Sequence, residues 1–167
     1  PVVLFVGLLS EQKGATVLLD AFAKMTAPQA ELVFVGDGPE RTNLQRLAAR
    51  LPRVRFLGQL SAEGAARAMS TARVVAHPSL VPEGFGLVGI EAMQLGRPVV
   101  SFGLGGCAEW LINGETGLVA DPVTASSLAA SLDDVLRDDA LADRLGDAGR
   151  RRVGRYFSTE RVASQLS

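Results

Sequence analysis

The sequence contains very little of what builds disulfide-bonded, metal-thiolate or membrane-spanning structures. Cys107 is the only cysteine among 167 residues, so the chain can form neither an internal disulfide nor a thiolate metal cluster. This cysteine usage fits a reducing compartment. No apolar run approaches the roughly 18 residues that a membrane-spanning helix requires. We therefore expect no membrane span in this segment.

The sequence also lacks an excess of charge of one sign. It has 17 Lys and Arg against 18 Asp and Glu, which gives a net charge of −1, and both signs are scattered. Small clusters occur at the arginines 150–152 and at the aspartates 133–134 and 138–139. Nucleic-acid-binding proteins instead carry a basic stripe or patch. We therefore expect no nucleic-acid partner.

Motifs for several common chemistries are missing as well. The P-loop pattern G-x-x-x-x-G-K-[ST] does not occur. No Ser or Cys nucleophile motif accompanies His77, the only histidine, which either packs or lines the rim of a site. No group of His, Cys, Asp and Glu residues has the spacing of metal ligands. The sequence therefore predicts no metal site.

What the sequence does contain is an alternation of strand and helix signals. Apolar runs without strict alternation predict strands that are buried on both faces, at 2–6, 31–35, 54–57, 74–77, 98–102 and 118–120. Helical spacing of apolar residues predicts helices at 16–25, 40–51, 62–72, 124–136, 140–153 and 159–166. This order predicts a single α/β domain with a Rossmann-like, doubly wound parallel sheet.

Glycines follow four of the predicted strands. They are Gly7, then Gly36 and Gly38, then Gly58, and finally the glycines within 103–106. Each could simply form a tight turn between a strand and a helix. Because open α/β sheets bind ligands beyond the carboxyl ends of their strands, several glycines on one rim favour a ligand cleft there.

The stretch 82–93 is the most informative part of the chain. It places Glu83 and Glu91 eight positions apart, with Gly84 and Gly86 after the first carboxylate. A helix that begins near these glycines would direct unpaired N–H groups and its positive dipole end toward an anion. Eight helical residues span about 12 Å, close to the reach of a diphosphate with a sugar at each end. We predict that the carboxylates meet sugar hydroxyls and that the phosphates lie over the turn.

Three charged residues in or near this arrangement each allow two interpretations. The helix around Glu91 is apolar nearly all round, which predicts a buried carboxylate whose donors are either protein groups or ligand hydroxyls. Glu83 either stabilises the helix dipole or accepts from a sugar hydroxyl. Lys13 lies near the start of the helix expected at 16–25, where a cation is unfavourable. It is therefore either a solvated lysine or a phosphate clamp.

These segments, in this order, resemble the C-terminal, donor-binding domain of family-four retaining glycosyltransferases, which have the GT-B architecture. The resemblance covers essentially the whole chain. It rests on FVG at 5–7, KG at 13–14, GDGP at 36–39, FLG at 56–58, PS at 78–79, EGFG at 83–86, EAM at 91–93, GRPVV at 96–100, GG at 105–106, Glu109 and NGETGLV at 113–119.

The resemblance implies that a nucleotide-diphosphate sugar is the donor substrate and that neither a cofactor nor a metal is needed. By matching position, Lys13 and Glu83 are the catalytic residues: Lys13 neutralises the leaving diphosphate, and Glu83 contacts the donor sugar. Glu91 holds the ribose hydroxyls. The remaining predicted donor-binding residues are Gly7, Gly38, Leu57 (facing the base) and, through their N–H groups, Phe85, Gly86 and Leu87.

The resemblance also implies a second domain. Pro1 is not preceded by Met and runs straight into an apolar segment, so we expect an excised piece of a longer protein. Residues 1–167 would be its donor domain, and an N-terminal acceptor domain would be absent. We expect transfer with retention when the two are joined, and no transfer by this piece alone. The expected location is cytoplasmic, with peripheral membrane attachment open through the missing half.

Leu8 departs from the family pattern. The family usually has an Arg here, which pairs with the Lys as a phosphate clamp. Loss of one charge that stabilises developing negative charge typically costs roughly a hundredfold in rate. A non-catalytic module that binds nucleotide-sugar therefore stays open as an alternative. A second alternative, independent of Leu8, is another GT-B enzyme such as a sugar-nucleotide epimerase or a phosphorylase.

Overall fold

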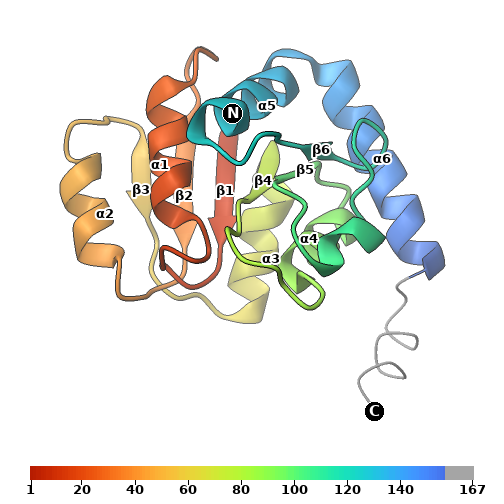
Figure 1. The fold of residues 1–167 in the computed structure, drawn as a ribbon, viewed down its shortest axis with the longest axis horizontal. Helices are drawn as coiled ribbons and strands as arrows, with labels where there is room; N and C mark the ends of the chain where they lie inside the picture. The colour runs from red at the N-terminus through yellow and green to blue at the C-terminus, as the bar shows by residue number, and fades with distance from the viewer. Residues whose placement is uncertain (157–167) are drawn as a thin grey trace.

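The chain forms one six-stranded parallel sheet with helices on both of its faces (Figure 1). The structure is a computed structural model and describes residues 1–156. The strands are β1 (Val2–Val6), β2 (Glu31–Val35), β3 (Val54–Phe56), β4 (Val74–His77), β5 (Val99–Ser101) and β6 (Leu118–Val119). Their order in the sheet is β3-β2-β1-β4-β5-β6. The predicted doubly wound α/β fold is therefore confirmed.

The helices divide between the two faces of the sheet. They are α1 (Ala15–Lys24), α2 (Arg41–Ala48), α3 (Ala62–Thr71), α4 (Leu87–Gln94), α5 (Ala125–Arg137) and α6 (Asp139–Tyr156), with a 3-10 turn, η1 (Gly106–Glu109). One core lies under α1, α2 and α5, and the other lies under α3 and α4, while α6 contributes to both. Within β1, Phe5 packs into the first core and Leu4 into the second. Burial on both faces explains why the strand sequences lack alternation.

The predicted element ends differ from the observed ones by a few residues. Strands β3, β5 and β6 are shorter than expected, so that Leu57, Pro98, Phe102 and Ala120 lie outside them. Helix α6 continues to Tyr156, past the expected end at residue 153. The helix expected at 159–166 lies outside the described residues. Across 1–156, no helix has both the length and the apolar character needed to cross a bilayer.

The sheet changes its direction of winding between β1 and β4. Strand β1 pairs with β2 on one side and with β4 on the other, so the connections that leave β1 and β4 run in opposite directions. In a parallel α/β sheet, a crevice opens at the carboxyl ends of the strands at such a point. The fold therefore places the loops after β1 and β4 around a common opening.

Candidate functional site

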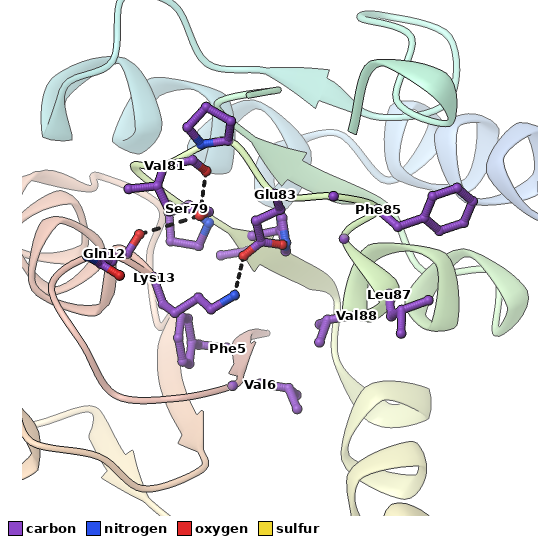
Figure 2. Close-up of a pocket in the computed structure, with 17 residues that line it drawn as sticks. Phe5, Val6, Gln12, Lys13, Ser79, Val81, Glu83, Phe85, Leu87 and Val88 are labelled. Atoms are coloured by element: carbon purple, nitrogen blue, oxygen red, sulfur yellow. Dashed lines mark hydrogen bonds and ion pairs between the residues drawn. The ribbon is translucent and has the colours of Figure 1, made fainter. Parts of the chain in front are cut away.

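A cavity of about 520 Å³ lies at the carboxyl ends of β1 and β4. Its walls come from the end of β1, the loop before α1, and most of the connection from β4 into α4. Figure 2 shows Lys13 extending across this cavity toward Glu83, with Leu87 and Val88 on the other side. The predicted residues Gly7, Lys13, Glu83, Phe85, Gly86 and Leu87 all line it. The structure thus brings six of the nine predicted site residues together.

Lys13 reaches the cavity because its loop is fastened to the loop after β4. Gly14, which follows it, has a left-handed backbone with φ of 78°, and a side chain there would overlap the carbonyl oxygen of Pro78. The N–H of Leu80 donates to the carbonyl of Gln12 over 2.8 Å. Glycine at position 14 therefore permits the close approach that sets the ammonium group of Lys13 beside the β4–α4 connection.

Both carboxylate oxygens of Glu83 contact a basic side chain. Lys13 Nζ lies 2.5 Å from Oε1, and His77 Nε2 lies 2.9 Å from Oε2. The side chain of Glu83 is 12% exposed. The hydrogen bond with His77 is the main reason that the pKa of Glu83 is lowered to about 2; Lys13 lowers it further, while burial opposes the shift. Glu83 is therefore an ionised, doubly anchored group on the cavity wall.

His77 is the residue on the second carboxylate oxygen of Glu83. It is the last residue of β4 and is 7% exposed. Its Nδ1 lies 3.3 Å from the hydroxyl of Ser101 and 3.9 Å from the sulfur of Cys107. Burial disfavours the charged imidazole, but the contacts with Cys107 and Glu83 outweigh it and raise the pKa of His77 to about 9. From the sequence, His77 was expected either to pack or to line the rim of a site. In the structure it contacts Glu83 directly.

The turn that carries Glu83 is clamped by the segment 105–110. The N–H of Gly106 donates to the carbonyl of Glu83 over 2.8 Å, and a side chain on Gly106 would overlap the carbonyl of Gly84. The indole N–H of Trp110 donates to the carbonyl of Phe85 over 2.6 Å. Trp110, which no sequence pattern had indicated, is fully buried and supports the turn through this hydrogen bond.

The start of α4 adds a second feature to the cavity. The helix begins at Leu87, and its first N–H groups have no partner within the helix. The glycines 84, 86 and 89 have the spacing G-x-G-x-x-G between a strand and a helix, as in dinucleotide-binding turns, and the last of them packs against the Trp110 ring. This spacing was available in the sequence as a further sign of an anion site.

Glu91 is exposed, so the prediction of a buried carboxylate is wrong. Only one side of α4 is covered, and the apolar side chain of Leu87 is itself 51% exposed. Apolar composition alone therefore did not report burial in so short a helix. Within residues 1–156, Glu91 makes no side-chain hydrogen bond or ion pair. It follows Leu87 by four residues and Val88 by three, which places it on the same side of the helix as two residues that line the cavity.

Gly38 and Leu57 line neither this cavity nor its neighbour. Gly38 packs against the backbone of Leu9, and Leu57 is 43% exposed just beyond β3. The neighbouring cavity, of about 390 Å³, shares Val6 and Gly7 with the first and includes Leu8. No cluster of three His, Cys, Asp or Glu residues in the described part of the chain could hold a metal ion.

Comparisons with known proteins give consistent matches over nearly the whole chain. A family model described as glycosyl transferases group 1 matches residues 1–152. A phosphatidyl-myo-inositol mannosyltransferase of Mycobacterium leprae is 37% identical over 167 residues, which cover 98% of this chain and 44% of that protein. A glycogen synthase of Mycobacterium tuberculosis is 34% identical over 166 residues, which cover 96% of this chain and 40% of that protein.

A solved structure gives the same result for the fold. The crystal structure of Anabaena HepE in complex with UDP-glucose superposes with a TM-score of 0.88 at 30% sequence identity. The match covers 99% of this chain and 48% of that one. The chain thus spans less than half the length of each of these relatives.

Proposed function

The chain belongs to the glycosyl transferases group 1 family, and we propose that it binds the nucleotide-diphosphate sugar from which the family transfers a sugar. The observation that carries this proposal is the cavity at β1 and β4, where Lys13 and the start of α4 face the carboxylate of Glu83. Lys13 and the start of α4 offer positive charge to a diphosphate, and Glu83, which contacts Lys13, offers an acceptor to sugar hydroxyls. The resemblance seen in the sequence agrees with this family.

The proposed donor lies across the turn between β4 and α4. Its diphosphate meets Lys13 and the backbone of Phe85, Gly86 and Leu87, where the helix dipole favours negative charge. As the sugar leaves, charge develops on the diphosphate, and groups already in place stabilise that charge without a metal. Glu83 holds the sugar, which is transferred with retention.

The nucleoside end of the donor extends along the exposed side of α4. There Glu91 accepts from the ribose hydroxyls, which would give this exposed carboxylate the partners that it lacks within residues 1–156. Gly7 lines both cavities. Gly38 and Leu57 follow β2 and β3, so they belong to loops at the same edge of this parallel sheet. Since HepE has been crystallised with UDP-glucose, a uridine nucleotide is the first donor to test.

The acceptor is proposed to bind elsewhere. Each relative is more than twice as long as the region that matches this chain. We therefore propose that residues 1–167 form the donor domain and that an N-terminal domain, as in GT-B enzymes, holds the acceptor. By itself the chain is expected to bind a donor without transferring its sugar.

The test is a thermal-shift panel of uridine, guanosine and adenosine diphosphate sugars on this chain. A ligand that binds the folded state raises the melting temperature, so the matching donor should stabilise it more than the others do. Calorimetry with that donor should then give about tenfold weaker binding for Glu91→Ala, the effect of losing about one hydrogen bond.

The matched control for that measurement is Glu115→Ala, which removes another exposed carboxylate that lines neither cavity at this edge. Its donor affinity should equal that of the wild type. If no nucleotide-sugar stabilises the wild-type chain, the proposed function is wrong. If a donor binds wild type and Glu91→Ala equally, the ribose role of Glu91 is wrong.

A further inference from the structure

His77 makes more specific contacts in the candidate site than a residue that only fills space in the core would need. Its Nε2 lies 2.9 Å from Glu83, and its Nδ1 lies 3.3 Å from the Ser101 hydroxyl, so both ring nitrogens have polar neighbours. The ring also meets Trp110 edge-on at a centroid distance of 5.9 Å. Contacts on both nitrogens and on the ring edge fix the orientation of the imidazole, and through it the orientation of the Glu83 carboxylate.

The charges around His77 can be assigned one by one. Glu83 faces Nε2 from the β4–α4 connection, and Cys107 faces Nδ1 from η1. Ser101 faces the ring from β5 and does not titrate in this range. Lys13 contacts only the other oxygen of Glu83. Ionised Glu83 is thus the nearest full charge to the ring, and it favours the imidazolium form.

A charged His77 changes what Lys13 can offer to a ligand. The ion pair of Lys13 with Glu83 alone is neutral, and a diphosphate would have to compete with Glu83 for the ammonium group. With an imidazolium on the second oxygen of Glu83, the three side chains carry one net positive charge. That charge lies on the wall of the cavity, because both His77 and Lys13 line it.

We propose that His77 is a positioning residue of the donor site: it holds Glu83 ionised and aimed into the cavity, and it leaves the charge of Lys13 available to the donor diphosphate. This inference rests on the proposed function, since it assigns a role within the same site. His77 acts through Glu83 and Lys13 and does not itself touch the donor.

The first experiment needs no donor. Because His77 is the only histidine, its imidazole signals in an NMR titration require no assignment by mutation. In the wild-type chain the ring should titrate well above the ordinary 6.5, near 9. In Glu83→Gln the midpoint should fall by at least one pH unit, since the negative partner is gone. An unchanged midpoint would overturn the proposed coupling.

The second experiment compares His77→Gln with His77→Leu in calorimetry with the best donor from the panel. Gln can still donate an N–H to Glu83 but carries no charge, and Leu can do neither. We expect at least tenfold weaker donor binding for His77→Leu and an intermediate loss for His77→Gln. Free nucleoside diphosphate should lose less affinity than the nucleotide-sugar does, because Glu83 faces the sugar.

The two experiments separate failure of this inference from failure of the proposed function. If no nucleotide-sugar binds the wild-type chain, the proposed function fails, and the His77 role in donor binding fails with it, while the NMR titration still decides the coupling. If a donor binds wild type and His77→Leu equally, only the positioning role is overturned. If His77→Leu does not fold, the His77→Gln affinity decides: a value equal to that of the wild type contradicts the need for charge.

Discussion

Glu83, in the connection from β4 to α4, and Glu91, within α4, are eight positions apart but lie in opposite environments. Glu83 is 12% exposed, with Lys13 on one carboxylate oxygen and His77 on the other. Glu91 is exposed, and its side chain has no partner within residues 1–156. The protein itself therefore fixes the first carboxylate before any ligand arrives. The second can be fixed only by what binds to it.

The backbone around the two residues differs in the same way. The turn at 83–86 is held by hydrogen bonds from Gly106 and Trp110. The side of α4 that carries Glu91 is uncovered and includes the exposed Leu87. A group that interacts with the reacting sugar benefits from being fixed in advance, because no reorganisation is then needed as charge develops. A group that only binds nucleoside hydroxyls does not need this.

The largest loss of stability is expected at Gly106, where the segment 105–110 packs against the turn at 83–86. In Gly106→Ala the added methyl group would overlap the carbonyl oxygen of Gly84, so the backbone must shift. We expect a loss of about 3 kcal/mol in the free energy of unfolding, at the upper end for overpacking. Gly84→Ala is the matched control, because nothing lies within 4 Å of a side chain at that position. Urea denaturation of both variants measures the difference. Equal stabilities would show that the contact between Gly106 and the turn at 83–86 does not restrict the backbone.

A smaller loss of stability should distinguish Glu83 from Glu91 directly. Glu83→Ala removes the acceptor of both Lys13 and His77 and leaves the buried imidazole without its partner, at a cost of about 2 kcal/mol. Glu91→Ala removes an exposed carboxylate that has no partner within residues 1–156 and should change stability by less than about 0.5 kcal/mol. The same denaturation measurement checks both. A Glu91→Ala cost as large as that of Glu83→Ala would remove the contrast between them.

The sequence was sufficient for the features that depend on local pattern. The six apolar runs predicted the six strands of residues 1–156. Strands β1, β2, β4 and β5 are buried along most of their length, and strands buried on both faces need continuous apolar sequence. The glycines after the strands predicted the edge at which the cavity lies. The glycines 84 and 86 led us to expect a helix that begins near them, and α4 does begin at Leu87.

Contacts between distant segments could not be predicted in this way. Lys13 and Glu83 are 70 positions apart, and their ion pair depends on a glycine-permitted contact between two loops. His77 also contacts Cys107 and Ser101, which come from other elements. The burial of Glu91 was predicted wrongly for a related reason: which side of α4 is covered depends on packing, and apolar composition does not reveal it. The roles assigned to these residues in donor binding stay predictions.

The smallest effect is the pH dependence of stability, and its direction follows from the two shifted pKa values. The pKa of Glu83 is lowered from 4.5 to about 2, so its stabilising contribution is present above pH 4.5 and is lost as the pH falls toward 2. The pKa of His77 is raised from 6.5 to about 9, so its contribution is present below pH 6.5 and is lost as the pH rises through 9. Both contributions describe one shared interaction, which is therefore strongest between about pH 4.5 and 6.5.

Between pH 6.5 and 9.5 the wild-type chain should lose about 1 kcal/mol more unfolding free energy than Glu83→Gln does, because a neutral imidazole still donates a hydrogen bond to Glu83 but no longer a charged one. Glu91→Gln should follow the wild-type curve, since Glu91 has no ion pair within residues 1–156 to lose. Denaturation at several pH values, taken as the difference between each variant and the wild type, cancels the titration of all other groups. Parallel curves for wild type and Glu83→Gln would mean that His77 is uncharged beside Glu83. The electrostatic difference between the two carboxylates would then rest on the ion pair of Glu83 with Lys13 alone.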